Sequence, residues 1–137
     1  MTQDKELLLK DLCARLPYGV KMNHIANDEH SPKTLIGVAK DMITLKGLGG
    51  YECVDVEDYK PYLFPTSSMT EEQRKYISDR WGINEDFDFE IDPNWGEYFV
   101  DLYDAVDYIN WLNENHFDYR SLIEKRLALD ATGKGIY

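Results

Sequence analysis

Carboxylates and aromatic rings are interleaved in one stretch of the chain. Residues 85–108 read EDFDFEIDPNWGEYFVDLYDAVDY and contain no lysine or arginine. The wider interval between Arg80 and Arg120 holds eleven acids and eleven aromatic residues. The rest of the chain carries fifteen acids and fifteen bases, so the formal net charge of −11 comes from this interval. Negative charge steers a cationic partner and aromatic rings bury area against it, so the composition predicts a docking surface for a basic protein.

The first part of the run alternates acidic and apolar residues from position 86 to position 92. Strict alternation is typical of a strand with one buried face and one wet face. Successive carboxylates on the wet face would lie about 6.6 Å apart, which is within the Debye length of about 8 Å, so they repel one another. A basic partner would relieve this repulsion. The carboxylates predicted to supply the field are Asp86, Asp88, Glu90 and Asp92.

The second part of the run has helical periodicity. The apolar stripe predicted to face the core comprises Leu102, Ala105, Val106, Ile109 and Leu112. Residues three and four apart meet on a helix, which places Asp104, Tyr108 and Trp111 on another side, with Asp107 close by. We predict that Tyr108 and Trp111 are buried against the partner and that the two aspartates add to the field. The alternative is that Trp111 packs beneath a neighbouring segment of this chain.

Two other interpretations of the acidic interval stay open. A solvated face would promote solubility and keep a sheet edge from pairing. Evenly spaced carboxylates could also mimic DNA, because phosphates along one strand rise by about 3.4 Å each. Direct binding of nucleic acid is not expected, since the largest charged region would repel phosphates.

Catalytic chemistry has weaker support. His24 or His116, each with nearby carboxylates, could act as a general base in a small hydrolase-like enzyme. A third hypothesis is a structural or oligomeric component with a self-interface of Trp95, Tyr98 and Phe99. No spacing matches a metal site, and a calcium loop starting at residue 86 lacks the glycine needed at its sixth position. We expect no cofactor and no metal.

The remaining patterns predict the elements around this region. Helical spacing indicates a helix over about 3–16 and another over about 70–81, where Thr70 and Gln73 form a capping box and Gly82 ends the helix. Short alternating runs predict a four-stranded antiparallel meander over about 20–56. Residues 57–65 are predicted to form an ordered loop and residues 86–92 a strand. Two helices are predicted over 101–125, with Asp118 capping the second, and an extended segment is predicted over 127–131. The fold class is therefore α+β, in a single domain (1–137) with a four- to five-stranded antiparallel sheet and helices packed on one side.

The cysteines and the lengths of the apolar runs indicate the cellular compartment of the protein. Cys13 and Cys53 lie in helical and strand-like patterns, and we expect both to be buried, reduced thiols. No run approaches the roughly 20 apolar residues of a membrane span. The three leucines at 7–9 are flanked by charges, which is not typical of a signal peptide. These features predict a cytoplasmic protein.

Three stretches together resemble a known group of proteins: KELLLKDLCARLPYGVK (5–21), YKPYLFPTSSMTEEQRKYI (59–77) and WLNENHFDYRSLIEKRLALDA (111–131). They resemble a family of small uncharacterised proteins of Bacteroidales bacteria, often encoded in prophages and other mobile elements. Family members often carry glycine where this chain has Ser121 and Arg126. Glycine suits the left-handed conformation that ends a helix, so the arginine at 126 leaves the helix boundary near that residue open. The resemblance implies a bacterial, cytoplasmic setting and a phage-linked interaction protein, and it brings no catalytic residues.

Overall fold

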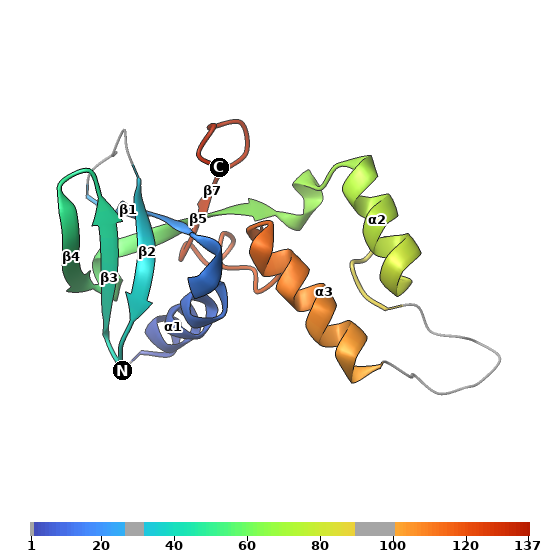
Figure 1. Ribbon diagram of the computed structural model, residues 1–137, viewed down its shortest axis with the longest axis horizontal. Coiled ribbons are helices and arrows are strands. Elements are labelled where there is room, and N and C mark those ends of the chain that lie inside the picture. The colour runs from blue at the N-terminus through green and yellow to red at the C-terminus, as the bar shows by residue number, and fades with distance from the viewer. Residues whose placement is uncertain (1, 27–31, 90–100) are drawn as a thin grey trace.

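The computed structural model describes residues 2–26, 32–89 and 101–137. The fold is α+β, a mostly antiparallel mixed sheet with three helices packed against it (Figure 1). In the described ranges seven strands form the sheet, in the order β4-β3-β2-β1-β5-β6, with β7 also paired to β5. The predicted fold class is confirmed, and the sheet has more strands than the four to five expected.

Helix α1 (Gln3–Arg15) begins where the sequence predicts. The Thr2 hydroxyl accepts a hydrogen bond from the backbone N–H of Lys5, at 3.2 Å, and so caps one of the free N–H groups at the helix start. A 3₁₀ turn (Leu16–Tyr18) follows, and Gly19, at φ 68°, reverses the chain into the sheet. Leu8 and Leu12 are buried and hold α1 against the meander.

The meander consists of β1 (Lys21–His24), β2 (Lys33–Val38), β3 (Met42–Gly47) and β4 (Gly50–Asp55). Each consecutive pair is antiparallel, as predicted. Alternation turns Leu35, Ile43 and Leu45 inward, where all three are buried. Cys53 on the β4 edge and Cys13 on α1 are both free and exposed, so the expectation that they are buried is wrong.

Strand β5 (Tyr59–Pro65) corrects the predicted loop. It pairs antiparallel with β1 and parallel with two short strands, β6 (Phe117–Asp118) and β7 (Leu129–Asp130). Prolines at 61 and 65 argue against a central strand, because proline cannot donate to the ladder. Each proline lies at the end of its pairing, Pro61 opposite Met22 of β1 and Pro65 opposite Asp118 of β6, so neither interrupts a pairing in its middle.

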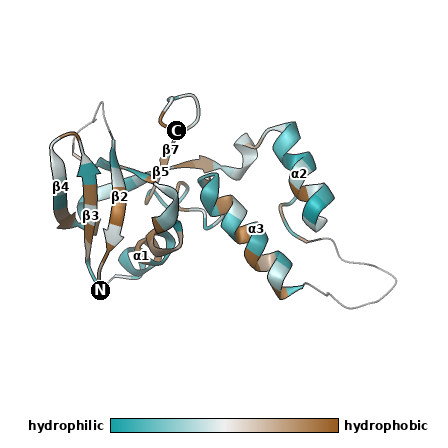
Figure 2. Cartoon of the chain, in the orientation of Figure 1, coloured by the Kyte–Doolittle hydropathy of each residue, from teal (hydrophilic) through white to brown (hydrophobic). Residues whose placement is uncertain are grey.

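Helices α2 (Glu71–Trp81) and α3 (Leu102–Glu114) lie beyond the end of β5, away from the meander (Figure 1). The capping box of Thr70 and Gln73 is present, and Gly82, at φ 67°, ends α2. The side chain of Asp101 caps α3 by accepting a hydrogen bond from the N–H of Tyr103, at 2.8 Å. Hydrophobic residues recur along α3, whereas α2 is mostly hydrophilic (Figure 2).

The predicted second C-terminal helix does not form. Residues 119–126 make a series of turns, in which Ser121 and Arg126 adopt positive φ values of 59° and 62°. Asp118 does act as a cap, because its carboxylate accepts the N–H groups of Leu122 and Ile123, each at 2.9 Å. Two left-handed residues cannot continue a right-handed helix, so the cap starts a turn and no helix follows.

The buried apolar residues form two clusters. The first is mainly aliphatic and lies between α1 and the meander, with Leu12, Ile43 and Leu63 among its members. The second is mainly aromatic and lies between α2, α3 and β6. Strand β5 links them, since Leu63 belongs to the first cluster and Phe64 packs on the second. None of the helices in the described ranges is long and apolar enough to cross a membrane.

Candidate functional site

Asp86, Phe87 and Asp88 lie in a tight turn. The Asn84 side-chain oxygen accepts hydrogen bonds from the backbone N–H groups of Asp86 (2.9 Å) and Asp88 (3.2 Å). The backbone N–H of Asn84 donates to the Asp88 carbonyl at 2.8 Å, and Phe87 has φ 63°. The predicted strand is therefore wrong over 86–88, and only Phe89 makes a bridge, to Ile83. We call residues 84–88 the acidic turn; Glu90 and Asp92 lie outside the described residues.

The Asn84 side chain explains why a turn forms here in place of the predicted strand. The short side chain of asparagine competes with the sheet ladder for nearby backbone N–H groups and so favours turns. The alternation of acids and rings in 86–89 is real, but the turn directs the side chains differently from a strand. Evenly spaced carboxylates are the basis of the DNA-mimic interpretation, and the acidic turn does not supply that spacing.

The orientation of α3 also differs from the prediction. Tyr108 is only 6% exposed and Leu112 only 3%, whereas Leu102 is 75% exposed and Val106 49%. The aromatic side of the helix faces the interior because rings from other elements cover it, and Leu112 is buried with it. Of the predicted apolar stripe, Leu102, Val106 and Ile109 face outward. Periodicity locates both sides of a helix but does not tell which one is covered.

Tyr108 and Trp111 are held by specific contacts. The Tyr108 hydroxyl donates to the Phe87 carbonyl at 3.1 Å, and its ring lies 5.6 Å from that of Trp81 and 5.8 Å from that of Phe89. Trp111 stacks between Tyr76 and Phe117, with centroids 5.7 Å from each. Trp111 thus packs under neighbouring segments of this chain, the alternative given for it above.

A cavity of about 390 Å³ opens between the acidic turn, α3 and the segment after β6. We call it the aromatic cavity. Its described lining contains three carboxylates, four aromatic rings and no basic residue. The lining residues are Thr66, Asp86, Phe87, Asp88, Phe89, Ala105, Tyr108, Ile109, Leu112, Asp118, Tyr119 and Ser121.

The three carboxylates of the aromatic cavity differ in availability. Asp118 is 8% exposed and already accepts two backbone N–H groups, so it contributes charge and no free contact. Asp86 and Asp88 are exposed, and Asp88 Oδ1 accepts the N–H of Phe89 at 2.9 Å. Burial, and secondly the Asp88 carboxylate, raise the pKa of Tyr108 to about 12. The negative charge of the acidic turn therefore acts on the wall of the aromatic cavity.

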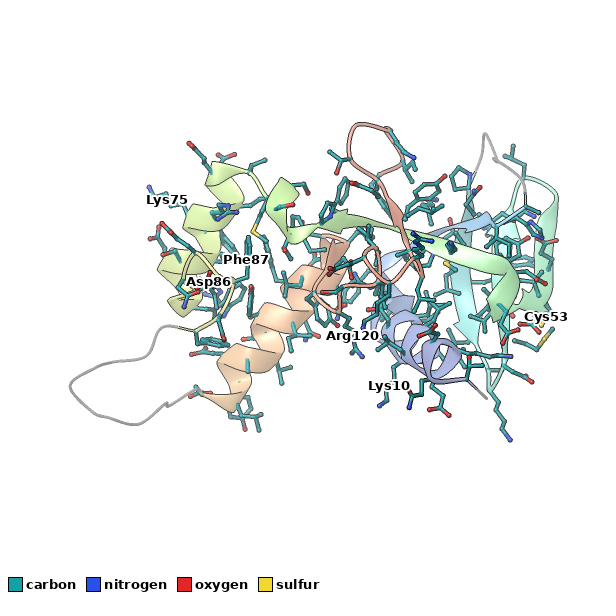
Figure 3. All side chains as sticks on the ribbon, turned by 180° about the vertical axis from the view of Figure 1, so that it is seen from behind. Lys10, Cys53, Lys75, Asp86, Phe87 and Arg120 are labelled. Carbon is teal, nitrogen blue, oxygen red and sulfur yellow. The ribbon has the colours of Figure 1, made fainter. Side chains whose placement is uncertain are left out.

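Basic side chains surround this region without lining the cavity. The Arg74 guanidinium lies over the Phe87 ring, 4.6 Å from its centroid. Arg74 and Lys75 share a separate open depression with Glu85 and Asp86, and Figure 3 shows Lys75 on the side of α2 near Asp86. Negative charge is therefore partly balanced on the α2 side of the acidic turn.

Other predicted acids stay at the surface. Asp104 and Asp107 on α3 are both exposed, and Asp104 lies one helical turn before Tyr108. Phe87 and Phe89, on the apolar side of the predicted strand, are partly buried against the aromatic core cluster and also line the aromatic cavity. The sequence did not predict the cavity or Tyr119 as one of its walls. Asn84 is the residue that could have indicated the position of Phe87 and Phe89. An asparagine directly before an acidic run favours a turn, and the turn presents the following rings at a surface.

Within the described residues, the histidines do not form the carboxylate pairs that the enzyme hypothesis needs; Asp28 and Glu29, the acids nearest His24 in the sequence, lie outside them. His24 accepts a hydrogen bond from the N–H of Ala26 at 3.0 Å, and its ring meets that of Tyr59 edge-on. His116 stacks on Tyr137, and burial, followed by the charges of Arg15 and Lys21, lowers its pKa to about 4. In the described part of the chain, neither ring is hydrogen-bonded to a carboxylate, and no metal-binding cluster is present. Trp95, Tyr98 and Phe99 lie outside the described residues.

Comparison with known proteins finds no counterpart: no family model, no curated protein and no solved structure matches the chain. The fold and the site thus define an α+β protein with an acid-rimmed aromatic cavity.

Proposed function

We propose that the chain is a non-enzymatic, cytoplasmic interaction protein whose acidic-aromatic region docks a basic protein surface. The docking surface comprises Asp86 and Asp88 of the acidic turn, Asp104 and Asp107 of α3, and the aromatic cavity. The observation that carries the proposal is the lining of this cavity, where carboxylates and rings meet without a basic side chain. The resemblance to Bacteroidales mobile-element proteins agrees with a role in binding a host component.

Each part of the surface has a separate physical role. The exposed carboxylates attract a cationic partner and raise its association rate, an effect that salt screens. The aromatic cavity supplies apolar area that a partner can bury, which slows dissociation. The mutual repulsion of the carboxylates falls when positive charge binds, so the free surface is primed for a basic partner.

A charge-matched pair of variants tests the proposal. The site variant replaces Asp86, Asp88, Asp104 and Asp107 by asparagine. The control variant replaces four exposed acids elsewhere, with the substitutions Glu6→Gln, Asp41→Asn, Asp58→Asn and Glu124→Gln. Both lose four negative charges, so the formal net charge goes from −11 to −11 + 4 = −7 in each.

The measurement is the Kd for a labelled lysine-rich amphipathic peptide, by fluorescence anisotropy at low and high salt. We expect the site variant to bind about tenfold more weakly, corresponding to about 1.4 kcal/mol, and the control to stay close to wild type. Equal weakening of both variants would reduce the effect to net charge and favour the solubilising interpretation of the acidic interval.

A further inference from the structure

The four rings of the aromatic cavity differ in what covers them. Phe87 lies under Arg74, at 4.6 Å, and Tyr119 lies under Arg15 and Arg120, at 5.3 Å and 5.4 Å. The chain therefore already places its own guanidinium groups on two of these rings. Over Phe89 and Tyr108, no basic side chain lies within the described residues. Phe89 is half-buried, whereas Tyr108 is 6% exposed and packs against Trp81 and Phe89, so Phe89 offers the larger open ring surface.

We infer that the aromatic cavity is a binding site for one cationic side chain, the alkylammonium of a lysine or the guanidinium of an arginine, on the basic partner. This inference rests on the proposed function and adds where the partner's cation is held. A cation near an aromatic ring is attracted to the negative face of the π system when it lies within about 6 Å of the centroid. Phe89 and Tyr108 supply the rings, and Asp86 and Asp88 supply carboxylates at the same cavity.

The lining selects a cation over other ligands. An anion would be repelled by Asp86, Asp88 and the buried carboxylate of Asp118. A neutral apolar group could fill the space but would bring no positive charge to the three carboxylates of the lining. A long basic side chain meets both requirements, because its methylene stem packs on apolar surface and its charged end stays near the acids.

The cavity has room for a basic side chain. Its volume of about 390 Å³ lies near the lower end of the roughly 300–1,000 Å³ that is typical of small-molecule sites. Ala105 and Leu112 line it with apolar area, where a stem can pack. A larger ligand would have to extend outward over the exposed Ile109 of α3.

The direct test titrates the full chain with n-butylammonium and n-butylguanidinium, followed by ¹⁵N–¹H correlation spectra. The neutral control ligand is n-pentanol, which has a similar length and no charge. We expect saturable shifts of amides around the cavity with Kd values of the order of millimolar, as for a single small group. Pentanol should cause shifts at least tenfold weaker at equal concentration.

Variants locate the site. Phe89→Leu keeps an apolar side chain but removes one ring, and Asp88→Asn removes one charge; each is expected to weaken cation binding at least threefold. Tyr76→Leu is the matched control, because Tyr76 is an exposed ring of the same aromatic cluster region that does not line the cavity. Its affinity for the cations should be unchanged, and unaltered spectra elsewhere show that each variant is folded.

The outcomes separate this inference from the proposed function. The inference is overturned if pentanol binds as well as the cations, or if Phe89→Leu behaves like Tyr76→Leu. The proposed function can survive that result, when the charge-matched variants still differ in peptide binding. Conversely, if the cations bind but replacing the peptide lysines one at a time by norleucine never weakens binding, the assignment to a partner's side chain is wrong.

Discussion

The buried ion pair of α1 gives the sharpest prediction. Arg15 Nε donates to Asp11 Oδ2 at 2.7 Å, and Arg15 Nη2 donates to the Phe117 carbonyl at 2.7 Å. Both charged side chains are 0% exposed. Arg120 approaches the other oxygen of Asp11 at 3.5 Å. The pair therefore joins the aliphatic half of the molecule to β6, beside the aromatic half.

The expected magnitude follows from desolvation. Burial raises the pKa of Asp11, and the Arg15 and Arg120 charges offset that rise only in part. Removing one partner leaves the other charge buried without compensation, which typically costs about 3–5 kcal/mol. We therefore expect Asp11→Asn and Arg15→Met each to destabilise the fold by about that amount. The melting temperature should fall by roughly 10–15 °C.

The double variant distinguishes a buried pair from two independent residues. Asp11→Leu with Arg15→Met removes both fully buried charges at once. Arg120 loses its partner as well, but its side chain is 30% exposed, so water can solvate its charge. What is left is the Phe117 carbonyl without its donor, a loss of about 1–3 kcal/mol. The double variant should therefore be more stable than either single variant.

Urea denaturation of the wild type, the two single variants and the double variant at pH 7 measures the coupling. A matched control is Lys10→Met on the same helix, because Lys10 is exposed and should change stability by less than about 0.5 kcal/mol. The reasoning is refuted if the two single effects simply add, or if each stays below about 1 kcal/mol.

Three further predictions follow from single residues. The pKa of His116 is about 4 in the folded protein, below its ordinary 6.5, so its contribution to stability is complete above pH 6.5 and is lost as the pH falls toward 4. The full pKa shift is equivalent to about 3 kcal/mol of unfolding free energy, and partial exposure of the ring reduces this to about 1–2 kcal/mol. Urea titrations between pH 4 and 7 should show a smaller loss of stability in His116→Asn than in the wild type. Asparagine is chosen because it tolerates the φ of 62° at this position. Arg126→Gly should raise the free energy of unfolding by about 0.5–1 kcal/mol because Arg126 has a positive φ, whereas Lys125→Gly should lower it; thermal melts that rank the two the other way would contradict this. Tyr108→Phe should cost about 1 kcal/mol in a urea titration through loss of the bond to the Phe87 carbonyl, and no change would mean that this bond is not formed.

The sequence predicted those elements whose signals are local. The capping box of Thr70 and Gln73 with the stop at Gly82 defined α2 almost to the residue. Alternation and tight turns were enough for the meander, because a half-buried antiparallel strand has a period of two. These features need only a few neighbouring residues, so a single sequence contains them.

The errors arose where distant residues decide the outcome. Pro61 and Pro65 argued for a loop, and a strand forms there because β1, β6 and β7, which come from distant parts of the chain, all pair with β5. The burial of Asp11 and Arg15 depends on the Phe117 carbonyl, which lies 102 positions after Arg15 in the sequence. The cover on Tyr108 comes from Trp81 and Phe89, which periodicity within α3 cannot report.

The buried pair also connects to the aromatic cavity, and this connection is testable. The Arg15 and Arg120 guanidiniums lie over Tyr119, one wall of the cavity, and Asp11 is the carboxylate that compensates both. Removing the charge of Asp11 adds net positive charge beside the cavity while leaving its lining unchanged. Asp11→Asn should therefore bind n-butylammonium several-fold more weakly than the wild type at a temperature where it is still folded, with high salt narrowing the difference. Equal affinities would show that the field of the paired arginines does not reach the site, and the preference for cations would then depend on the local carboxylates and rings alone.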